Sequence, residues 1–187
     1  MPRISTSDFK TGITLDLPDG LFELSEFQHV NPGKGGAFVR TKLRDLRHGT
    51  VVERTFRAGE RMEQAMVDHR SVQLLYHVAG SYVFMDNNSF EQVEVSEHVL
   101  GDSKDYLVPE LTATLSFYGP EIIGVELPSS VALEVVETDP GLQGDRVSRA
   151  TKLAIVETGK SIRVPLFVRI GDRVIVNTAT GEYVSRT

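Results

Sequence analysis

Apolar and polar residues alternate along most of this chain. The stretches 21–30, 37–46 and 50–58 follow this alternation and are rich in β-branched and aromatic residues. A period of two is typical of strands that bury one face. Because a short turn at 47–50 joins the second and third stretches, we predict a small antiparallel barrel that ends near residue 64.

A second group of alternating stretches follows the first. Between its third and fourth members, residues 96–108 form the one helical candidate, with Ser96 at the expected N-cap and Gly101 weakening the helix. Four or five strands with one short helix are typical of an OB-type barrel. The predicted strands of this group are 71–78, 81–86, 90–95, 112–119 and 122–128.

The last third of the chain repeats the pattern. A strand is predicted at 131–139, and further strands are predicted within 160–187. Between them lies a long loop at 140–152 that contains glycine and arginine. The segments "FMDNNSFEQV" and "VNTATGEYV" each place a short polar turn between strands, which indicates duplicated folds. We therefore predict an all-β protein of three consecutive small barrels. The predicted domains are 1–64, 65–128 and 129–187.

Composition excludes several classes of protein. The chain has 187 residues, is 40% hydrophobic and 25% charged, and contains no cysteine. These values are typical of a globular domain protein without disulfides or thiolate metal sites. No apolar run approaches the ~18 residues of a membrane span, and the first residues lack the apolar core of a signal peptide. We expect a cytoplasmic protein with no membrane partner.

Charge is unevenly distributed over the three predicted domains. The middle domain, 65–128, has 2 Lys/Arg against 10 Asp/Glu, whereas the segment 29–61 has 8 basic and 3 acidic residues. Such asymmetry suggests that the first domain meets a polyanion and the middle one does not. A plain alternative is that the acidic block only keeps the protein soluble.

Motifs for catalysis and metal binding are missing from the sequence. The "GK" at Gly33 and Lys34 fails the phosphate-binding loop pattern at two positions, and no G-x-S-x-G motif is present. The five histidines show no metal-ligand spacing. We expect no catalytic residues, no metal and no cofactor, and therefore not an enzyme.

The most distinctive segment is the loop "NPGKGG" at residues 31–36. Glycines allow positive φ and add no side-chain bulk, so such a loop can enter a narrow space and present one extended ammonium group. A flexible hairpin with a solvent-exposed lysine is the plain alternative. The residues of this loop are Pro32, Gly33, Lys34, Gly35 and Gly36.

Several segments resemble the bacterial elongation factor P family. The first-domain segment is "PGKGGAFVRTKLRDL", and the second-domain segment is "YVFMDNNSFEQ". Third-domain segments are "TDPGLQGDR", "KLAIVETGKSIRVPLFVRIG" and "GEYVSR". The resemblance covers nearly the whole chain and is most specific at 152–171.

The resemblance implies both a fold and a function. The fold is a KOW/SH3-like barrel followed by two OB-fold barrels, in an L-shaped arrangement similar to a tRNA. The function is that of a translation elongation factor, related to the archaeal and eukaryotic hypusine-containing factor. It binds the 70S ribosome between the peptidyl-tRNA and exit sites and relieves stalling at consecutive prolines, with Lys34 touching the CCA end of peptidyl-tRNA.

The resemblance also implies further candidate residues. Arg146, Arg149 and Leu153 depart from the residues usual in the family, which leaves the detail of their loop open. Whether Lys34 is modified, and so whether a lysine-modifying enzyme is a partner, is left open too. A monomer is expected from the tRNA-like role. The candidates are Arg40, Lys42, Arg44 and Arg54 for tRNA phosphates, Gly144, Asp145 and Arg146 for the exit-site codon and small subunit, and Tyr183 and Arg186 at the C-terminus.

A second hypothesis is a stand-alone OB-fold protein that binds single-stranded nucleic acid. Such proteins interleave exposed aromatic side chains with basic ones. The middle domain has only Arg70 and Lys104 as bases, which argues against this class. The aromatic residues considered are Tyr76, Tyr82, Phe84, Phe90, Phe117 and Tyr118.

Overall fold

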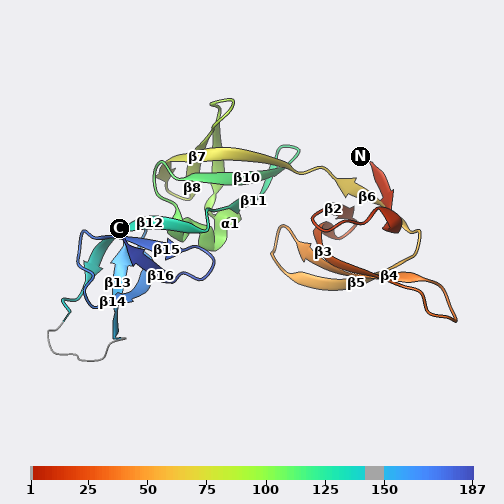
Figure 1. The fold of residues 1–187 in the computed structure, drawn as a ribbon. Coiled ribbons are helices and arrows are strands. Elements are labelled where there is room, and N and C mark those ends of the chain that lie inside the picture. The colour runs from red at the N-terminus through yellow and green to blue at the C-terminus, as the bar shows by residue number, and fades with distance from the viewer. Residues whose placement is uncertain (1, 142–149) are drawn as a thin grey trace. The chain divides into compact units, whose positions relative to one another are not determined.

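The structure is a computed structural model that describes residues 2–141 and 150–187 (Figure 1). It is built almost entirely of β-strands in three sheets, as the alternation predicts. The chain divides into two compact units. One consists of Met1–His69 and Ser116–Gly124, the other of Arg70–Leu115 and Val125–Thr187. No helix in the described ranges is long and apolar enough to cross a membrane.

The first sheet has six strands in the order β1-β6-β2-β3-β4-β5. The three strands predicted from alternation are confirmed as β3, β4 and β5. The short strands β1, β2 and β6 were not predicted, because three to five residues are too few to show a period. The bounds are β1 Arg3–Ser5, β2 Thr14–Leu17, β3 Gly20–Val30, β4 Phe38–Asp45, β5 Val51–Arg57 and β6 Arg61–Ala65.

Alternate residues of these strands form the first core. Leu15, Leu24, Val39 and Leu43 are fully buried there. Phe9 closes the core, with its ring centroid 5.8 Å from that of Phe56 in an edge-to-face arrangement. Such pairs add to the free energy gained by burial, so this cluster holds the base of the β3–β4 hairpin.

The second sheet has five strands in the order β11-β10-β7-β8-β9. The predicted helix over 96–108 is wrong in type over most of its length. Only Glu97–Leu100 (α1) is α-helical, because Gly101 at φ 54° ends it, and Gly101–Tyr106 (η2) is a 3-10 helix. The predicted cap is confirmed, since the Ser96 side chain accepts a hydrogen bond from the His98 N–H. The strands are β7 Asp68–Val78, β8 Ser81–Asp86, β9 Gln92–Ser96, β10 Thr112–Tyr118 and β11 Glu121–Glu126.

The third sheet repeats the second in strand order. Numbered within each domain, both follow 3-2-1-4-5, which confirms the predicted duplication. The two similar turns noticed in the sequence nevertheless close different hairpins, β8–β9 in one domain and β15–β16 in the other. Strand β13 begins inside the stretch predicted as loop 140–152. The strands are β12 Ser130–Thr138, β13 Thr151–Val156, β14 Ser161–Pro165, β15 Arg173–Asn177 and β16 Tyr183–Arg186.

Candidate functional site

The β3–β4 hairpin carries the loop that contains Lys34. Its last cross-strand pair is Val30 with Phe38, so residues 31–37 form the connection (Figure 1). Buried residues of β3 lie in its first half, at positions 21, 22 and 24, and the second half is mostly exposed. The hairpin therefore extends beyond the core that anchors it, and we call residues 31–37 the tip loop.

Lys34 lies at the exposed end of the tip loop. Its side chain makes no hydrogen bond or ion pair with any residue that the structure describes. Gly35 has φ 111°, a conformation that L-residues rarely adopt, so glycine is required there by the backbone. The tip loop is thus open, and its ammonium group is available to a partner.

Gly33 and Gly36 are not required by the free protein. Neither has a positive φ, and a Cβ atom added at either would meet nothing within 4 Å. Neither the backbone conformation nor the available space in the isolated chain therefore explains why these two residues are glycine. The absence of side chains there is useful only against a partner that approaches the backbone closely.

Three of the four candidate phosphate contacts share one exposed face of the hairpin. Arg40, Lys42 and Arg44 alternate with buried residues along β4. Arg54 pairs with Thr41 across the β4–β5 ladder and therefore lies on the other face. The structure brings together the first three and separates the fourth from them.

Acidic partners accompany these basic side chains. The Lys42 ammonium lies 3.1 Å from a carboxylate oxygen of Glu26, and the Arg44 guanidinium lies 2.9 Å from Glu23. A bulge between positions 24 and 26 of β3 places both carboxylates on the same face, although their spacing of three would separate them on a regular strand. The Ser25 hydroxyl donates to the Lys42 carbonyl at the bulge, 2.9 Å away.

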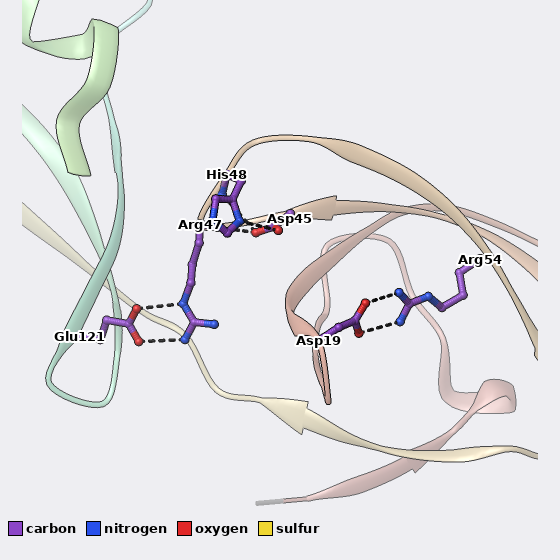
Figure 2. Close-up of polar contacts among 6 residues, drawn as sticks. All are labelled: Asp19, Asp45, Arg47, His48, Arg54 and Glu121. Carbon is purple, nitrogen blue, oxygen red and sulfur yellow. Dashed lines mark hydrogen bonds and ion pairs between the residues drawn. The ribbon is translucent and has the colours of Figure 1, made fainter. Parts of the chain in front are cut away.

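Arg54 and Arg47 each form a bidentate ion pair with a carboxylate (Figure 2). Arg54 donates to both oxygens of Asp19, and its guanidinium lies 5.2 Å from the centre of the Phe22 ring. Arg47 donates to both oxygens of Glu121, each over 2.9 Å. The arginine hydrogen bonds lower the pKa of Asp19 and of Glu121, so both carboxyls stay ionised in weakly acidic solution.

Arg40 differs from the other candidates. It makes no ion pair among the described residues, and its guanidinium lies 5.5 Å from the centre of the Phe38 ring. Phe38 is the first residue of β4 after the tip loop. Arg40 is therefore the candidate phosphate contact nearest to the tip in sequence and the only one of the four without an acidic partner in the described ranges.

The acidic partners of these basic residues were not predicted from the sequence. Asp19, Glu23 and Glu26 precede the basic segment 29–61, and their pairing with its arginines and lysine depends on the bulge and on the β2–β3 turn. A signal was nevertheless present, because opposite charges at facing positions of a hairpin stabilise it. The bulge, which the sequence does not mark, was needed to find the register.

Two C-terminal candidates have structural partners. Tyr183 packs against the core of the third domain. Arg186 lies 3.5 Å from Asp172, and its guanidinium lies 5.0 Å from the centre of the Phe167 ring. Leu153 is 56% exposed on β13. The candidates Gly144, Asp145 and Arg146, with Arg149, lie outside the described residues.

Nothing in the described ranges forms a cluster of three or more potential metal ligands. That the protein uses no cofactor and has no catalytic activity remains a prediction from the sequence.

Solved structures of translation factors share this fold. An initiation factor 5A from Methanococcus jannaschii is 19% identical with a TM-score of 0.53, over 68% of this chain and 92% of that one. An eIF-5A family protein from Naegleria fowleri is 14% identical with a TM-score of 0.55, over 67% of this chain and 98% of that one.

Family models identify the chain more closely. It matches the elongation factor P KOW-like domain over residues 5–62, the elongation factor P OB domain over 67–125, and the elongation factor P C-terminal domain over 131–186. The chain belongs to the elongation factor P family and is a translation elongation factor.

Proposed function

We propose that this factor binds the ribosome between the peptidyl-tRNA and exit sites and relieves stalling at consecutive prolines. Lys34 braces the CCA end of peptidyl-tRNA, either bare or lengthened by a modifying enzyme. The observation that supports this most strongly is the tip loop, in which an unpaired Lys34 lies between Gly33 and Gly36, two glycines that the free protein does not need.

Positioning is sufficient for such a role. Proline has a fixed φ and a rigid ring, which restrict the geometries available to the reacting groups. Misplacing reacting groups by 1 Å can cost about a hundredfold in rate. A lysine that holds the CCA backbone restores alignment without taking part in bond formation, so we infer that the protein itself is not an enzyme.

The exposed face of the hairpin would bind tRNA phosphates. Arg40 is free to make such a contact at once, whereas Lys42 and Arg44 must first leave Glu26 and Glu23. Exposed ion pairs generally contribute little to stability, so the exchange costs little. Each phosphate contact formed with the ends of tRNA should steepen the salt dependence of binding by ~0.7–0.9 in a log–log plot.

The remaining parts of the proposal follow from this role. The factor works as a monomer among ribosomes in the cytoplasm.

Of the middle-domain aromatic side chains that the second hypothesis would need, Tyr82, Phe84 and Phe117 are buried, which weakens the single-stranded nucleic-acid-binding alternative.

Peptide synthesis in a reconstituted ribosome system tests the proposal. A message with three consecutive prolines is translated without factor, with the protein from its native source, and with its Lys34→Ala variant. We expect stimulation by the first protein and not by the second, and no effect of either on a message without proline pairs. Equal stimulation by both proteins would refute the role of Lys34, and no stimulation by either would refute the proposed function.

A further inference from the structure

The β8–β9 hairpin closes through a rigid turn over residues 86–91, which we call the Phe90 turn. The buried Asp86 carboxylate accepts hydrogen bonds from the N–H groups of Asn88 and Ser89, 2.8 and 3.1 Å away. The Asp86 backbone also receives the Phe90 N–H and donates to the Glu91 carbonyl, each over 2.9 Å. The conformation of the turn is therefore set by its own hydrogen bonds.

The β15–β16 hairpin contains the same turn over residues 177–182, which we call the Gly181 turn. Asn177 accepts the N–H groups of Ala179 and Thr180 at 2.8 and 3.1 Å, as Asp86 does in the other turn. Its backbone receives the Gly181 N–H and donates to the Glu182 carbonyl. The two turns match at every one of these bonds, so they form a matched pair within one chain.

The fifth position of this turn requires a positive φ. Gly181 occupies it at 75° and Phe90 at 61°. Glycine adopts this conformation without steric cost, whereas a residue with a Cβ atom is disfavoured there. Among the described residues only Phe90 and Glu110 have positive φ without being glycine.

Packing within the protein does not compensate for this strain. Phe90 is 69% exposed, more than any other large hydrophobic side chain in the described ranges. The ring makes no aromatic or cation–π contact with a described residue. Glycine would avoid the strain at this position, and no contact among the described residues accounts for the exposed ring.

The charge around the turn indicates what kind of partner it fits. Residues 71–103 contain five acidic side chains and no Lys or Arg, and of these acids Glu91 and Glu94 are exposed. Arg70, immediately before this segment, acts electrostatically on Asp86, but the acidic side chains outnumber it. A phosphate backbone would be repelled by this surface. A protein that offers an apolar pocket bordered by lysine or arginine would be attracted, and a guanidinium group could stack on the ring.

We propose that Phe90 is an anchor by which the factor docks on a basic protein of the ribosome. This inference rests on the proposed function, because it takes the ribosome as the place of binding. It assigns to the middle domain a contact separate from the tip loop: Phe90 holds the factor in place, and Lys34 acts at the reaction centre.

Binding of the full-length protein to 70S ribosomes with peptidyl-tRNA tests the anchor. Phe90→Gly and Phe90→Ala should each raise the Kd about tenfold or more, as loss of an aromatic anchor does. Ser89→Ala, on the same turn, is the control and should bind like the original protein. At saturating concentration Phe90→Gly should still stimulate synthesis on the proline message, whereas Lys34→Ala should not.

The outcomes separate this inference from the proposed function. An unchanged Kd for Phe90→Gly would overturn the anchor while leaving the role of Lys34 intact. If the original protein does not bind ribosomes, the proposed function fails and the anchor fails with it. A lower maximal yield for Phe90→Gly at saturation would also overturn the assignment, since a docking residue should change only the concentration required.

The class of the partner is tested by cross-linking. A photoreactive benzoylphenylalanine at position 90 is irradiated on purified 70S ribosomes, and the same group at the exposed position Met66 serves as control. We expect a product at position 90 that resists nuclease and is removed by protease, joined to a protein segment rich in Lys or Arg. A product joined to RNA, or one no stronger than that from position 66, would overturn the proposal.

Discussion

The tip loop and the Phe90 turn both end hairpins, and they are built in opposite ways. No hydrogen bond ties residues 31–36 of the tip loop to the described part of the chain. The Phe90 turn, in contrast, is held by hydrogen bonds to a buried carboxylate and to the backbone of Asp86. The tip loop has glycine at positions 33 and 36, where the fold has space for a side chain. The Phe90 turn has a large side chain at a position whose positive φ favours glycine.

The comparison identifies two kinds of residue that the fold alone does not explain. At Gly33 and Gly36 the free protein has room for a side chain that is absent. At Phe90 it has a large, mostly exposed side chain at a backbone conformation that favours glycine. The Gly181 turn serves as an internal reference, because it has the same hydrogen bonds without the strained aromatic residue.

The largest effect should follow from filling the tip loop. Gly33→Ala and Gly36→Ala should lower stimulation on the proline message about tenfold or more, because added Cβ atoms hinder close approach to the partner. Their free energies of unfolding should stay within about 0.5 kcal/mol of the original. Both quantities are measured on each variant, by peptide yield and by chemical denaturation.

Gly124→Ala is the matched control for these tip-loop variants. Like Gly33, Gly124 has no positive φ and no atom within 4 Å of an added Cβ, but it lies on β11. It should keep full activity. If Gly33→Ala and Gly36→Ala also kept full activity, the tip loop would need no close contact.

Exchanging residues at the fifth position of the two turns should change stability in opposite directions. Phe90→Gly should raise the free energy of unfolding by about 1 kcal/mol, because it removes the strain of a positive φ. Gly181→Ala should lower it by about 1 kcal/mol or more, since its Cβ would also lie 3.1 Å from the Tyr106 hydroxyl. Chemical denaturation measures both, and a destabilised Phe90→Gly would show that the ring contributes to the fold.

The next largest effect should be a difference between the two turns in how their stability depends on pH. The N–H groups of Asn88 and Ser89 hold the pKa of Asp86 below its ordinary value of 3.8. A carboxyl whose pKa is lower in the folded state stabilises the protein fully above the unfolded pKa, and this contribution is lost as the pH falls through the folded pKa. The Phe90 turn should therefore weaken below about pH 4, whereas the Gly181 turn, with Asn177, should not.

Two substitutions at position 86 test this expectation. Asp86→Asn keeps an oxygen acceptor, as Asn177 does, and should remove this part of the stability loss in acid. Asp86→Ala leaves two N–H groups without their acceptor and should destabilise the protein at every pH. Denaturation followed from pH 7 to pH 2 compares them, and equal acid slopes for Asp86→Asn and the original protein would contradict the role of the carboxylate.

The smallest effect should come from the hydroxyl groups of the two turns. The Glu91 N–H lies 3.4 Å from the Ser89 hydroxyl, and the Glu182 N–H lies 3.3 Å from the Thr180 hydroxyl. Both distances are at the long end for hydrogen bonds. Ser89→Ala and Thr180→Ala should each change the free energy of unfolding by less than about 0.5 kcal/mol, and a larger change in only one would show that the turns are less alike than their bonds suggest.

Much of the fold could be predicted from the sequence. Long alternating stretches gave β3, β4, β5, β7 and β8 with bounds within a few residues. The helix was overestimated, because a polar segment with a good cap at Ser96 looks helical until Gly101 turns the chain. The strands β1, β2, β6 and β13 were missed, since their pairing depends on distant partners and not on a local period.

The candidate site was predictable in part. Residue type and glycine content marked the tip loop, and in the structure it is exposed, with free space at Gly33 and Gly36. The basic residues of β4 were found, but their pairing with Glu23 and Glu26 was not. One inserted residue at Ser25 changes which side chains share a face, and alternation alone does not reveal it.

The sequence by itself determined the all-β class, the duplication, the unequal charge and the lysine among glycines, because these follow from local pattern and composition. Only the tertiary structure decided which charges meet, which glycines have a structural reason, and that Phe90 is strained and exposed. These depend on register, backbone angles and burial. All three are set by contacts between residues far apart in the chain, so no local pattern contains them.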